Sequence, residues 1–357
     1  MHHYLHIPLW PFSQLYGGIM RLRNLGYDKG MLPSRRFSLP VIAVGNLTVG
    51  GTGKTPHVEY LLRLLHAYNV ATLSRGYKRQ SKGFILANDC STAALLGDEP
   101  YQYHLDFNQV AVAVCEDRVK GIEQLLERLP QLEVVVLDDA MQHRPVQPSL
   151  NLLITDYNRP FYKDYVLPAG RLREPRNGAK RADAVVVSKC PATMGPQERE
   201  SIQKLVRQYS APGIPVFFSS FAYGAFVAMG EAATPEKKVV LLTGIANAEP
   251  LKEHLEKEGY TLLKHIAYPD HHHYTQGNLE ELQNLLLQPG YAGASVITTR
   301  KDAVKLTDAN LGPLTSQLPI FFVPIKVQFM ADGEKFDQLV LQHVQGQMLR
   351  PEAAKIR

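Results

Sequence analysis

Short apolar runs recur through the first half of the chain and alternate with segments of helical periodicity. The runs are rich in Val, Ile and Leu and cover residues 41–46, 69–74, 109–114, 133–139, 150–156 and 184–189. They show no strict alternation with polar residues, which is typical of strands buried on both faces of a parallel sheet. Between two of them, in segment 56–67, Val58, Leu61, Leu62 and Leu65 recur at helical spacing. The pattern predicts a doubly wound, mostly parallel α/β sheet with helices on both faces.

A second and shorter alternation begins at residue 237. Its apolar runs cover residues 237–244, 261–268, 294–299 and 318–325, and its helical patterns cover 249–257 and 278–287. This predicts a second, smaller α/β unit. The join between the two series, residues 214–231, is rich in aromatic and β-branched residues and is therefore expected to be extended chain.

The length of the chain also favours more than one domain. At 357 residues it exceeds the typical domain of about 100–200 residues. We expect an N-terminal helical region (1–30), a core domain (31–215), a smaller α/β domain with extended connecting strands (216–330), and a C-terminal part (331–357). The sequence leaves open whether the last helical pattern, 334–345, returns to the core.

Composition narrows the class of protein only slightly. The chain has 39 basic and 34 acidic side chains, a net charge of +5, which is compatible with anionic ligands, nucleic acid or an anionic membrane and selects none of them. Three cysteines without C-x-x-C spacing argue against a disulfide framework or a zinc knuckle and favour a reducing, cytosolic compartment. No run approaches the roughly 20 apolar residues of a transmembrane helix.

The N-terminal segment 12–26 is amphipathic. Its apolar residues Phe12, Leu15, Tyr16, Ile19, Met20 and Leu22 lie largely on one helical face, with Arg21 and Arg23 beside it. A helix lying in a membrane interface, with arginines near acidic headgroups, would have this pattern. A terminal helix packed on its own domain would have it too, and the sequence alone does not separate the two.

A glycine-rich loop follows the first predicted strand. The stretch "AVGNLTVGGTGKTPHVEYLL" (43–62) departs from a strict G-x-x-x-x-G-K-[ST] phosphate-binding loop because Thr48 stands where the pattern needs glycine. Glycines between a strand and a helix allow the backbone to approach a phosphate, and the helix directs its N–H groups at the anion. We expect a nucleotide site formed by Thr48, Val49, Gly50, Gly51, Thr52, Gly53, Lys54 and Thr55. Lys54 would meet the β- and γ-phosphates and the Thr55 hydroxyl would meet Mg²⁺.

Two adjacent aspartates supply candidate metal ligands. Asp138 and Asp139 end the apolar run 133–139, at the carboxyl edge of the predicted sheet, where open α/β sheets bind ligands. The loop variant has a parallel in the K-G-G-x-G-K-T loops of a class that includes partition ATPases and metal-insertion chaperones. Those loops have lysine where this chain has Val49. The difference favours a kinase, and a switch or chaperone ATPase is the alternative.

Motifs along nearly the whole chain resemble one family, the tetraacyldisaccharide 4′-kinases of lipid A biosynthesis. They are "PFSQLYGGIMRLRNLGY", "VGNLTVGGTGKTP", "LSRGYKR", "GDEP", "VVVLDDAMQHR", "LPAGRLREP", "PDHHHYT" and "TTRKDAVK", in this order. The Thr48 variant belongs to that pattern. The resemblance implies ATP- and Mg²⁺-dependent phosphorylation of the 4′-hydroxyl of a tetraacylated glucosamine disaccharide 1-phosphate. It places the protein at the cytoplasmic face of the bacterial inner membrane, as a peripheral or monotopic protein with no nucleic acid and no obligate protein partner.

The resemblance also suggests catalytic residues. The "GDEP" motif offers Asp98 or Glu99 as the proton acceptor, and the family pattern favours Asp98, supported by His271 from the second unit. Together with Lys54 and Asp139 these form the expected catalytic set. His271, His272 and His273 cannot easily share one metal ion, because successive side chains of extended chain point to opposite faces. His272 and His273 stay unassigned.

Basic motifs are expected to bind the lipid substrate. The candidates are Arg75, Tyr77, Arg171, Arg173 and Glu174. Arginine matches phosphate oxygens with a bidentate fork, and Glu174 would orient an arginine or bind substrate. Each arginine could equally be a solvated surface charge.

Overall fold

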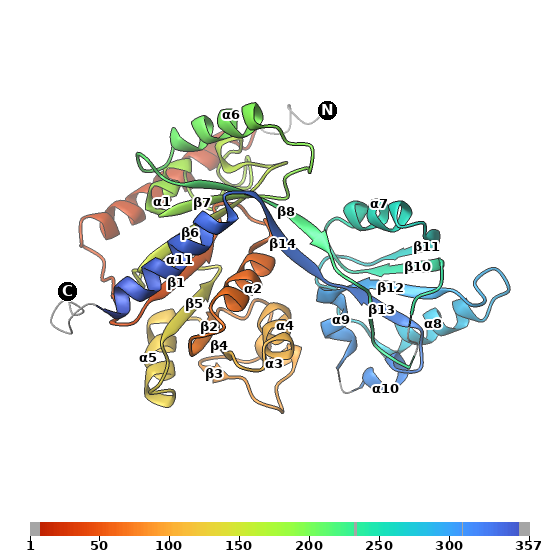
Figure 1. Ribbon diagram of the computed structural model, residues 1–357. Helices are drawn as coiled ribbons and strands as arrows, with labels where there is room; N and C mark the ends of the chain where they lie inside the picture. The colour runs from red at the N-terminus through yellow and green to blue at the C-terminus, as the bar shows by residue number, and fades with distance from the viewer. Residues whose placement is uncertain (1–7, 232–233, 309, 350–357) are drawn as a thin grey trace.

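The strands form two sheets that lie side by side (Figure 1). The computed structural model describes residues 8–231, 234–308 and 310–349. One sheet has nine strands and the other has five, with helices packed against both. The predicted fold class, a mostly parallel α/β sheet with a second, smaller α/β unit, is confirmed.

The nine-stranded sheet carries the glycine-rich loop. Its strands are β1 (Val41–Gly45), β2 (Val70–Ser74), β3 (Ile85–Leu86), β4 (Ala111–Val114), β5 (Val134–Asp138), β6 (Leu150–Asp156), β7 (Ala184–Ser188), β8 (Val216–Tyr223) and β14 (Ile325–Ala331). Their order is β14-β8-β7-β6-β1-β5-β2-β4-β3. The pairs from β8 to β4 are parallel, and the outermost pairs, β14 with β8 and β3 with β4, are antiparallel.

Apolar residues of β1 point alternately to two cores. Ile42 and Val44 pack with residues of α2 (Lys54–Leu64), α4 (Asp98–Asp106) and α11 (Gly333–Met348). Val41 and Ala43 pack on the other face with residues of α5 (Arg118–Arg128), and α6 (Pro196–Arg207) packs in a third cluster with β7. The other helical elements of this larger unit are α1 (Trp10–Asp28), α3 (Ala93–Leu96), η1 (Phe161–Lys163) and η2 (Arg176–Arg181). Burial on both faces explains why these strands are continuous apolar runs.

The five-stranded sheet has the order β11-β10-β12-β13-β9. Its strands are β9 (Val227–Ala228), β10 (Lys238–Thr243), β11 (Thr261–Ala267), β12 (Ser295–Thr299) and β13 (Ile320–Val323). Its helices are α7 (Glu249–Lys257), α8 (Gln276–Leu286), α9 (Arg300–Leu306) and α10 (Gly312–Thr315). Residues of α7 and α8 enter different clusters, which cover opposite faces of β10.

Two strands expected in the second unit belong to the larger sheet. β8 pairs in parallel with β7, and β14 pairs antiparallel with β8, so the chain crosses between the sheets twice at the same place (Figure 1). The apolar run 318–325, expected as one strand, divides into β13 and β14 at Pro324, which has no N–H to donate. The chain thus leaves the nine-stranded sheet at the end of β8, Tyr223, and returns to it at the start of β14, Ile325. After β14, the helix α11 buries Phe336, Val340 and Val344 on the nine-stranded sheet.

Candidate functional site

The glycine-rich loop runs from the end of β1 to the start of α2. Gly50 and Gly53 have φ of +108° and +85°, conformations that other residues rarely adopt. A Cβ at Gly53 would also lie 2.6 Å from Cζ of Phe221. Thr48, by contrast, pairs through its backbone with Leu172 in an antiparallel bridge, and the Val49 N–H donates to the Arg171 carbonyl at 2.8 Å. Thr48 and Val49 are therefore paired as in a strand, and glycine is not needed at position 48.

Lys54 and Arg173 converge on Asp139. The Lys54 ammonium lies 3.3 Å from Oδ1 of Asp139, and Nη1 of Arg173 donates to both carboxylate oxygens at 3.0 and 2.9 Å. Asp139 itself has a left-handed backbone, with φ of +50°, just after β5. Burial alone would raise the pKa of Asp139, but the two cations outweigh it and hold that pKa below its ordinary value. The carboxylate is thus kept ionised at the edge of the sheet.

Asp138 occupies a different environment from its neighbour. It is buried, and its Oδ2 accepts a hydrogen bond from the Tyr103 hydroxyl at 3.0 Å. Its Oδ1 has no hydrogen-bond partner among the described residues. Burial, and then the nearby charge of Glu99, raise the pKa of Asp138 to about 7. A buried carboxylate oxygen without a partner is chemically suited to a hard cation such as Mg²⁺.

Asp98 and His271 meet across the two sheets. Asp98 is the first residue of α4, and Nδ1 of His271 lies 3.2 Å from its Oδ2. Nε2 of His271 lies 3.1 Å from the Lys301 ammonium, which can only donate. Nε2 therefore accepts, and the ring proton on Nδ1 is donated to Asp98. Burial alone would raise the pKa of Asp98, but the His271 hydrogen bond and the charges of Lys305 and Lys301 hold it below its ordinary value.

The candidate substrate residues are spread over several environments. Arg75 and Arg171 are exposed, and so is Tyr77, whose ring packs edge-on against His271 with 5.5 Å between ring centroids. Arg173 is occupied by Asp139, as described above. Glu174 is 1% exposed and accepts hydrogen bonds from Arg181, Gln142 and Asn24 at 2.6, 2.9 and 2.8 Å. Of the two roles expected for Glu174, the structure favours orienting an arginine, Arg181.

Several residues of this region were missed by the sequence analysis. The Gln142 amide donates to the carbonyl of Asn46 at 2.8 Å, and its oxygen accepts from Arg173 at 3.3 Å. The buried guanidinium of Arg118 lies 3.4 Å from the Asp139 carbonyl. Lys189 follows β7 and reaches the glycine-rich loop. The one available signal was position: Gln142 lies within "DDAMQH", and Lys189 ends a predicted strand, as Asp139 does.

Helix α1 joins this site through polar side chains. The Tyr16 hydroxyl donates to the Arg173 carbonyl at 2.9 Å, and Arg23 donates to the Gln142 carbonyl at 3.1 Å. The large apolar residues point the other way, and Phe12, Leu15, Ile19 and Leu22 are 56–71% exposed. This arrangement is the reverse of an ordinary surface helix, which buries its apolar face. No helix in the described part of the chain is long and apolar enough to cross a bilayer.

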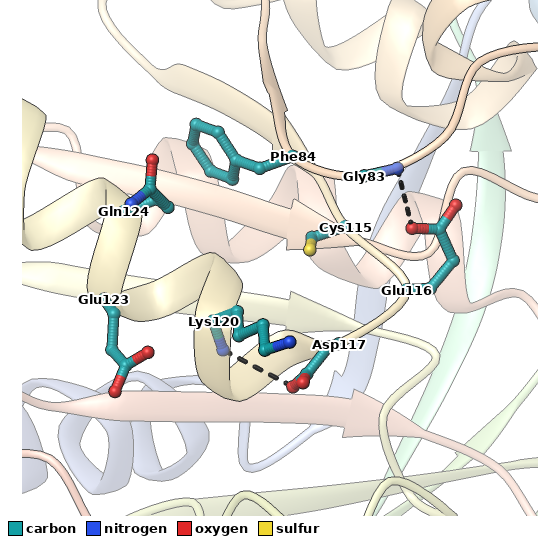
Figure 2. A pocket seen from close by; sticks show the side chains of 8 residues that line it. All are labelled: Gly83, Phe84, Cys115, Glu116, Asp117, Lys120, Glu123 and Gln124. Atoms are coloured by element: carbon teal, nitrogen blue, oxygen red, sulfur yellow. Dashed lines mark hydrogen bonds between the residues drawn. The ribbon is translucent and has the colours of Figure 1, made fainter.

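The most voluminous of the described pockets, about 570 Å³, lies beside the site rather than in it. Figure 2 shows it between Phe84, Cys115 and the first turns of α5. The lining carries three carboxylates, those of Glu116, Asp117 and Glu123, and a single amine, that of Lys120, so it does not suit a phosphate. The Gly83 N–H and Arg79 already bind Glu116. We therefore place no ligand there.

Comparison with known proteins agrees with this geometry. A family model described as tetraacyldisaccharide-1-P 4′-kinase matches residues 5–345. Proteins named tetraacyldisaccharide 4′-kinase from Flavobacterium johnsoniae and Cytophaga hutchinsonii are 43% and 44% identical, covering 94% and 93% of this chain and 96% and 94% of their own. The crystal structure of LpxK from Aquifex aeolicus in complex with ATP is similar, with a TM-score of 0.74 and 33% identity over 95% of this chain and 99% of that one. The chain therefore belongs to the tetraacyldisaccharide-1-P 4′-kinase family.

Proposed function

We propose that this protein transfers the γ-phosphoryl group of ATP to the 4′-hydroxyl of a tetraacylated glucosamine disaccharide 1-phosphate. The observation that carries the proposal is the arrangement around α4. Asp98 at its start faces His271, and Tyr103 in its middle binds Asp138, which lies next to the Lys54–Asp139 pair. One short helix thus links a proton acceptor to the phosphate and metal residues that a kinase requires.

The triphosphate would lie against the loop 48–55. Backbone N–H groups of the loop and of the first turn of α2 would bind phosphate oxygens, and Lys54 would exchange part of its contact with Asp139 for the γ-phosphate. Thr55, Asp138 and Asp139 would hold Mg²⁺, Asp138 through its unpartnered Oδ1. When bound, Mg²⁺ would neutralise charge on the phosphate oxygens and help to align them.

The proton of the 4′-hydroxyl would move to the Asp98 carboxylate. The 4′-oxygen then forms a bond to the γ-phosphorus, the bond between that phosphorus and the β–γ bridging oxygen breaks, and ADP leaves with the electron pair. Asp98 suits this role because its pKa lies below the ordinary value, so it is ionised before the reaction. His271, held by Lys301, orients the carboxylate with its Nδ1 proton. Its position in the second unit would connect the reaction to closure of the two units over ATP.

The disaccharide would enter from the side of the exposed basic residues. Arg75, Tyr77 and Arg171 lie at the surface near this edge and are free to contact the sugar and its 1-phosphate. Arg173 would act on the reaction centre through Asp139. Glu174 would act indirectly, because its three hydrogen bonds are made inside the protein.

The apolar face of α1 would bind the cytoplasmic face of the inner membrane, where the lipid substrate resides. Four exposed apolar side chains on one face, with Arg21 beside them, suit the boundary between headgroups and acyl chains. The polar face of α1 contacts residues 142 and 173, so this helix would place the site at the membrane surface.

The decisive test is phosphoryl transfer from ATP labelled at the γ-position. We expect label to appear in tetraacyldisaccharide 1-phosphate only when protein, Mg²⁺ and lipid are all present. The same lipid already carrying a 4′-phosphate serves as the control and should accept no label. ATP hydrolysis at the same rate with and without lipid, and no labelled lipid, would contradict the proposal.

A further inference from the structure

Side chains donate hydrogen bonds to several carbonyl groups of the glycine-rich loop. Four consecutive carbonyls, those of residues 50 to 53, accept hydrogen bonds. The donors are Asn46 to Gly50 (3.5 Å), Lys189 to Gly51, Ser188 to Thr52 (2.7 Å) and His57 Nδ1 to Gly53 (2.7 Å). Two of these donors, Ser188 and Lys189, are consecutive residues at the end of β7, two strands away from β1 in the sheet.

This pattern determines which groups of the loop are free for a ligand. A peptide unit carries its carbonyl and its N–H on opposite sides, so a carbonyl held from behind turns the N–H of the next residue toward the front. Phosphate oxygens need N–H groups and are repelled by carbonyl oxygens. The four donors therefore hold these carbonyl groups away from a bound anion before any anion is present. The Thr52 N–H itself donates to the Gly50 carbonyl at 3.0 Å, which closes the turn and leaves phosphate oxygens to the other N–H groups of the loop and of the first turn of α2.

Lys189 differs from the other three donors because it is charged. Asn46 and Ser188 are neutral, and burial lowers the pKa of His57 to about 4, so this ring is neutral as well. His57 donates from Nδ1 to Gly53, and its Nε2 accepts from the Ser219 hydroxyl at 3.0 Å. The Lys189 ammonium also donates to Oδ2 of Asp156, the last residue of β6, at 2.7 Å. The ammonium is thus held between the glycine-rich loop and the end of β6.

The backbone of Lys189 is strained. Its φ is +58°, in the left-handed region that favours glycine and is unfavourable for other residues. Such a conformation persists only where its surroundings fix it, as the bonds to Gly51 and Asp156 do. The loop itself has Val49, not lysine, at the position where related loops carry a second cation. Lys189 instead brings a cation to the loop from the end of β7, two strands away from β1.

We propose that Lys189 is a positioning residue of the ATP site, which orients the Gly51 peptide unit and adds a fixed positive charge behind the loop. The proposal rests on the placement of the triphosphate at residues 48–55 given above. Lys189 is not expected to touch the transferred phosphoryl group. Its removal should weaken ATP binding more than it slows the chemical step.

The test compares Lys189→Met, Lys189→Arg and a control, Lys252→Met. Lys252 is a lysine of α7 with similar side-chain exposure, 25% against 33%, and also has one carboxylate partner at 2.7 Å, Glu249. In Lys189→Met we expect the Kd of ATP, measured by calorimetry, and the KM for ATP to rise about 10- to 100-fold, the range for a lost charge-assisted hydrogen bond. The KM for lipid and the melting temperature should change little. Lys189→Arg should recover most of the affinity, and Lys252→Met should behave as the parent protein.

Two results would overturn the proposal. One is unchanged ATP affinity in a folded Lys189→Met protein. The other is Lys189→Arg binding ATP as weakly as Lys189→Met, which would mean that the charge is not what matters. If Lys189→Met fails to fold, Asp156→Asn tests the same arrangement, since it frees the ammonium but keeps its bond to Gly51; a rise of about two- to fivefold in the Kd of ATP is expected, and no rise contradicts the proposal. Full activity of Lys54→Ala would instead mean that the triphosphate does not bind at the loop, which contradicts the proposed function. A failure of the Lys189 proposal alone is therefore distinguishable from a failure of the proposed function.

Discussion

The nucleotide loop and the Asp98–His271 pair belong to one site but are held in different ways. The loop is fixed within a single sheet by buried side chains: Asn46 and Ser188 are 0% exposed and His57 is 3% exposed. Asp98 and His271 come from elements on different sheets, and their side chains are 14% and 18% exposed. Their contact depends on how the two sheets lie relative to each other.

Further polar contacts between α4 and α9 accompany the Asp98–His271 pair. Arg300, the first residue of α9, binds both carboxylate oxygens of Asp106, the last residue of α4, at 2.6–3.1 Å. The next residue, Lys301, binds His271, which binds Asp98 at the other end of α4. We propose from this difference that the loop is formed before ATP binds, whereas the proposed proton acceptor is completed by the contact between α4 and α9.

The largest effect should come from Asp98. Asp98→Asn keeps the size of the side chain but removes its basicity, so kcat should fall about 10²- to 10⁴-fold while the Kd of ATP stays nearly unchanged. His271→Ala should cost less, and the double variant should cost less in free energy than the sum of the two, because the residues act together. A steady-state cycle of the four proteins measures this. Full additivity would show that they do not work as a pair, and a failure of ATP binding in Asp98→Asn would give Asp98 a metal or structural role.

The same pair makes a prediction about pH. In the proposed reaction the ionised form of Asp98 is the active one, and this form is lost as the pH falls through the pKa of Asp98. The pKa of Asp98 is held low in part by the His271 hydrogen bond, so His271→Ala should raise it. The low-pH limb of the kcat/KM profile should therefore move to higher pH in His271→Ala. A limb at the same pH would mean that His271 does not act on this carboxylate.

Lys54→Ala tests the other region. Loss of a cation that contacts the transferring phosphoryl group should lower turnover about 10²- to 10³-fold. The fold should persist, because the Lys54 side chain contacts Asp139 at the edge of the sheet rather than the core. Turnover and circular dichroism measured on the same protein check both statements. Near-normal turnover would mean that the triphosphate does not bind at this loop.

A smaller effect is expected for the Arg300–Asp106 contact between α9 and α4. Charge reversal of either partner, Arg300→Asp or Asp106→Arg, should lower kcat about tenfold without changing the Kd of ATP, and the double reversal should recover most of the loss. The more exposed surface pair Arg35–Glu123, within the first unit, is a control whose loss should leave kcat unchanged. Equal losses in ATP affinity and kcat would contradict the proposal that the nucleotide loop and the Asp98–His271 pair are held in different ways.

The smallest effect concerns the outer face of α1. Leu15 and Ile19 are 67% and 56% exposed, so Leu15→Glu with Ile19→Glu should leave the fold intact. The KM for lipid in vesicles should rise severalfold, and more than the KM for lipid dispersed in detergent, because insertion of the helix is weakened. Leu287→Glu, at a leucine that is 77% exposed on the smaller unit, is the control. Unchanged binding to anionic vesicles would leave α1 as a helix packed only on its own domain.

The sequence alone was enough to locate most strands and the loop. The six apolar runs of the first series coincide with β1, β2, β4, β5, β6 and β7 to within two residues at either end, and 249–257 coincides with α7. These features are local: burial on both faces makes a strand continuously apolar, and positive φ requires glycine at Gly50 and Gly53. Each motif is likewise a short stretch of sequence, and the motifs in their order indicated the family.

Other features depended on which segments become neighbours. Nothing local distinguishes β8 and the edge strand β14 from strands of the smaller sheet, since the apolar pattern does not encode which strands pair with each other. The same holds for Glu174, which a motif places beside the substrate and the fold places inside the protein, bound to Asn24, Gln142 and Arg181. Lys189 reaches Gly51 across 138 residues of chain, and only the parallel order β7-β6-β1 brings its ammonium to the loop. Composition and spacing determined which chemical groups the chain carries, whereas the packing of strand ends decided which of these side chains lie together in one site.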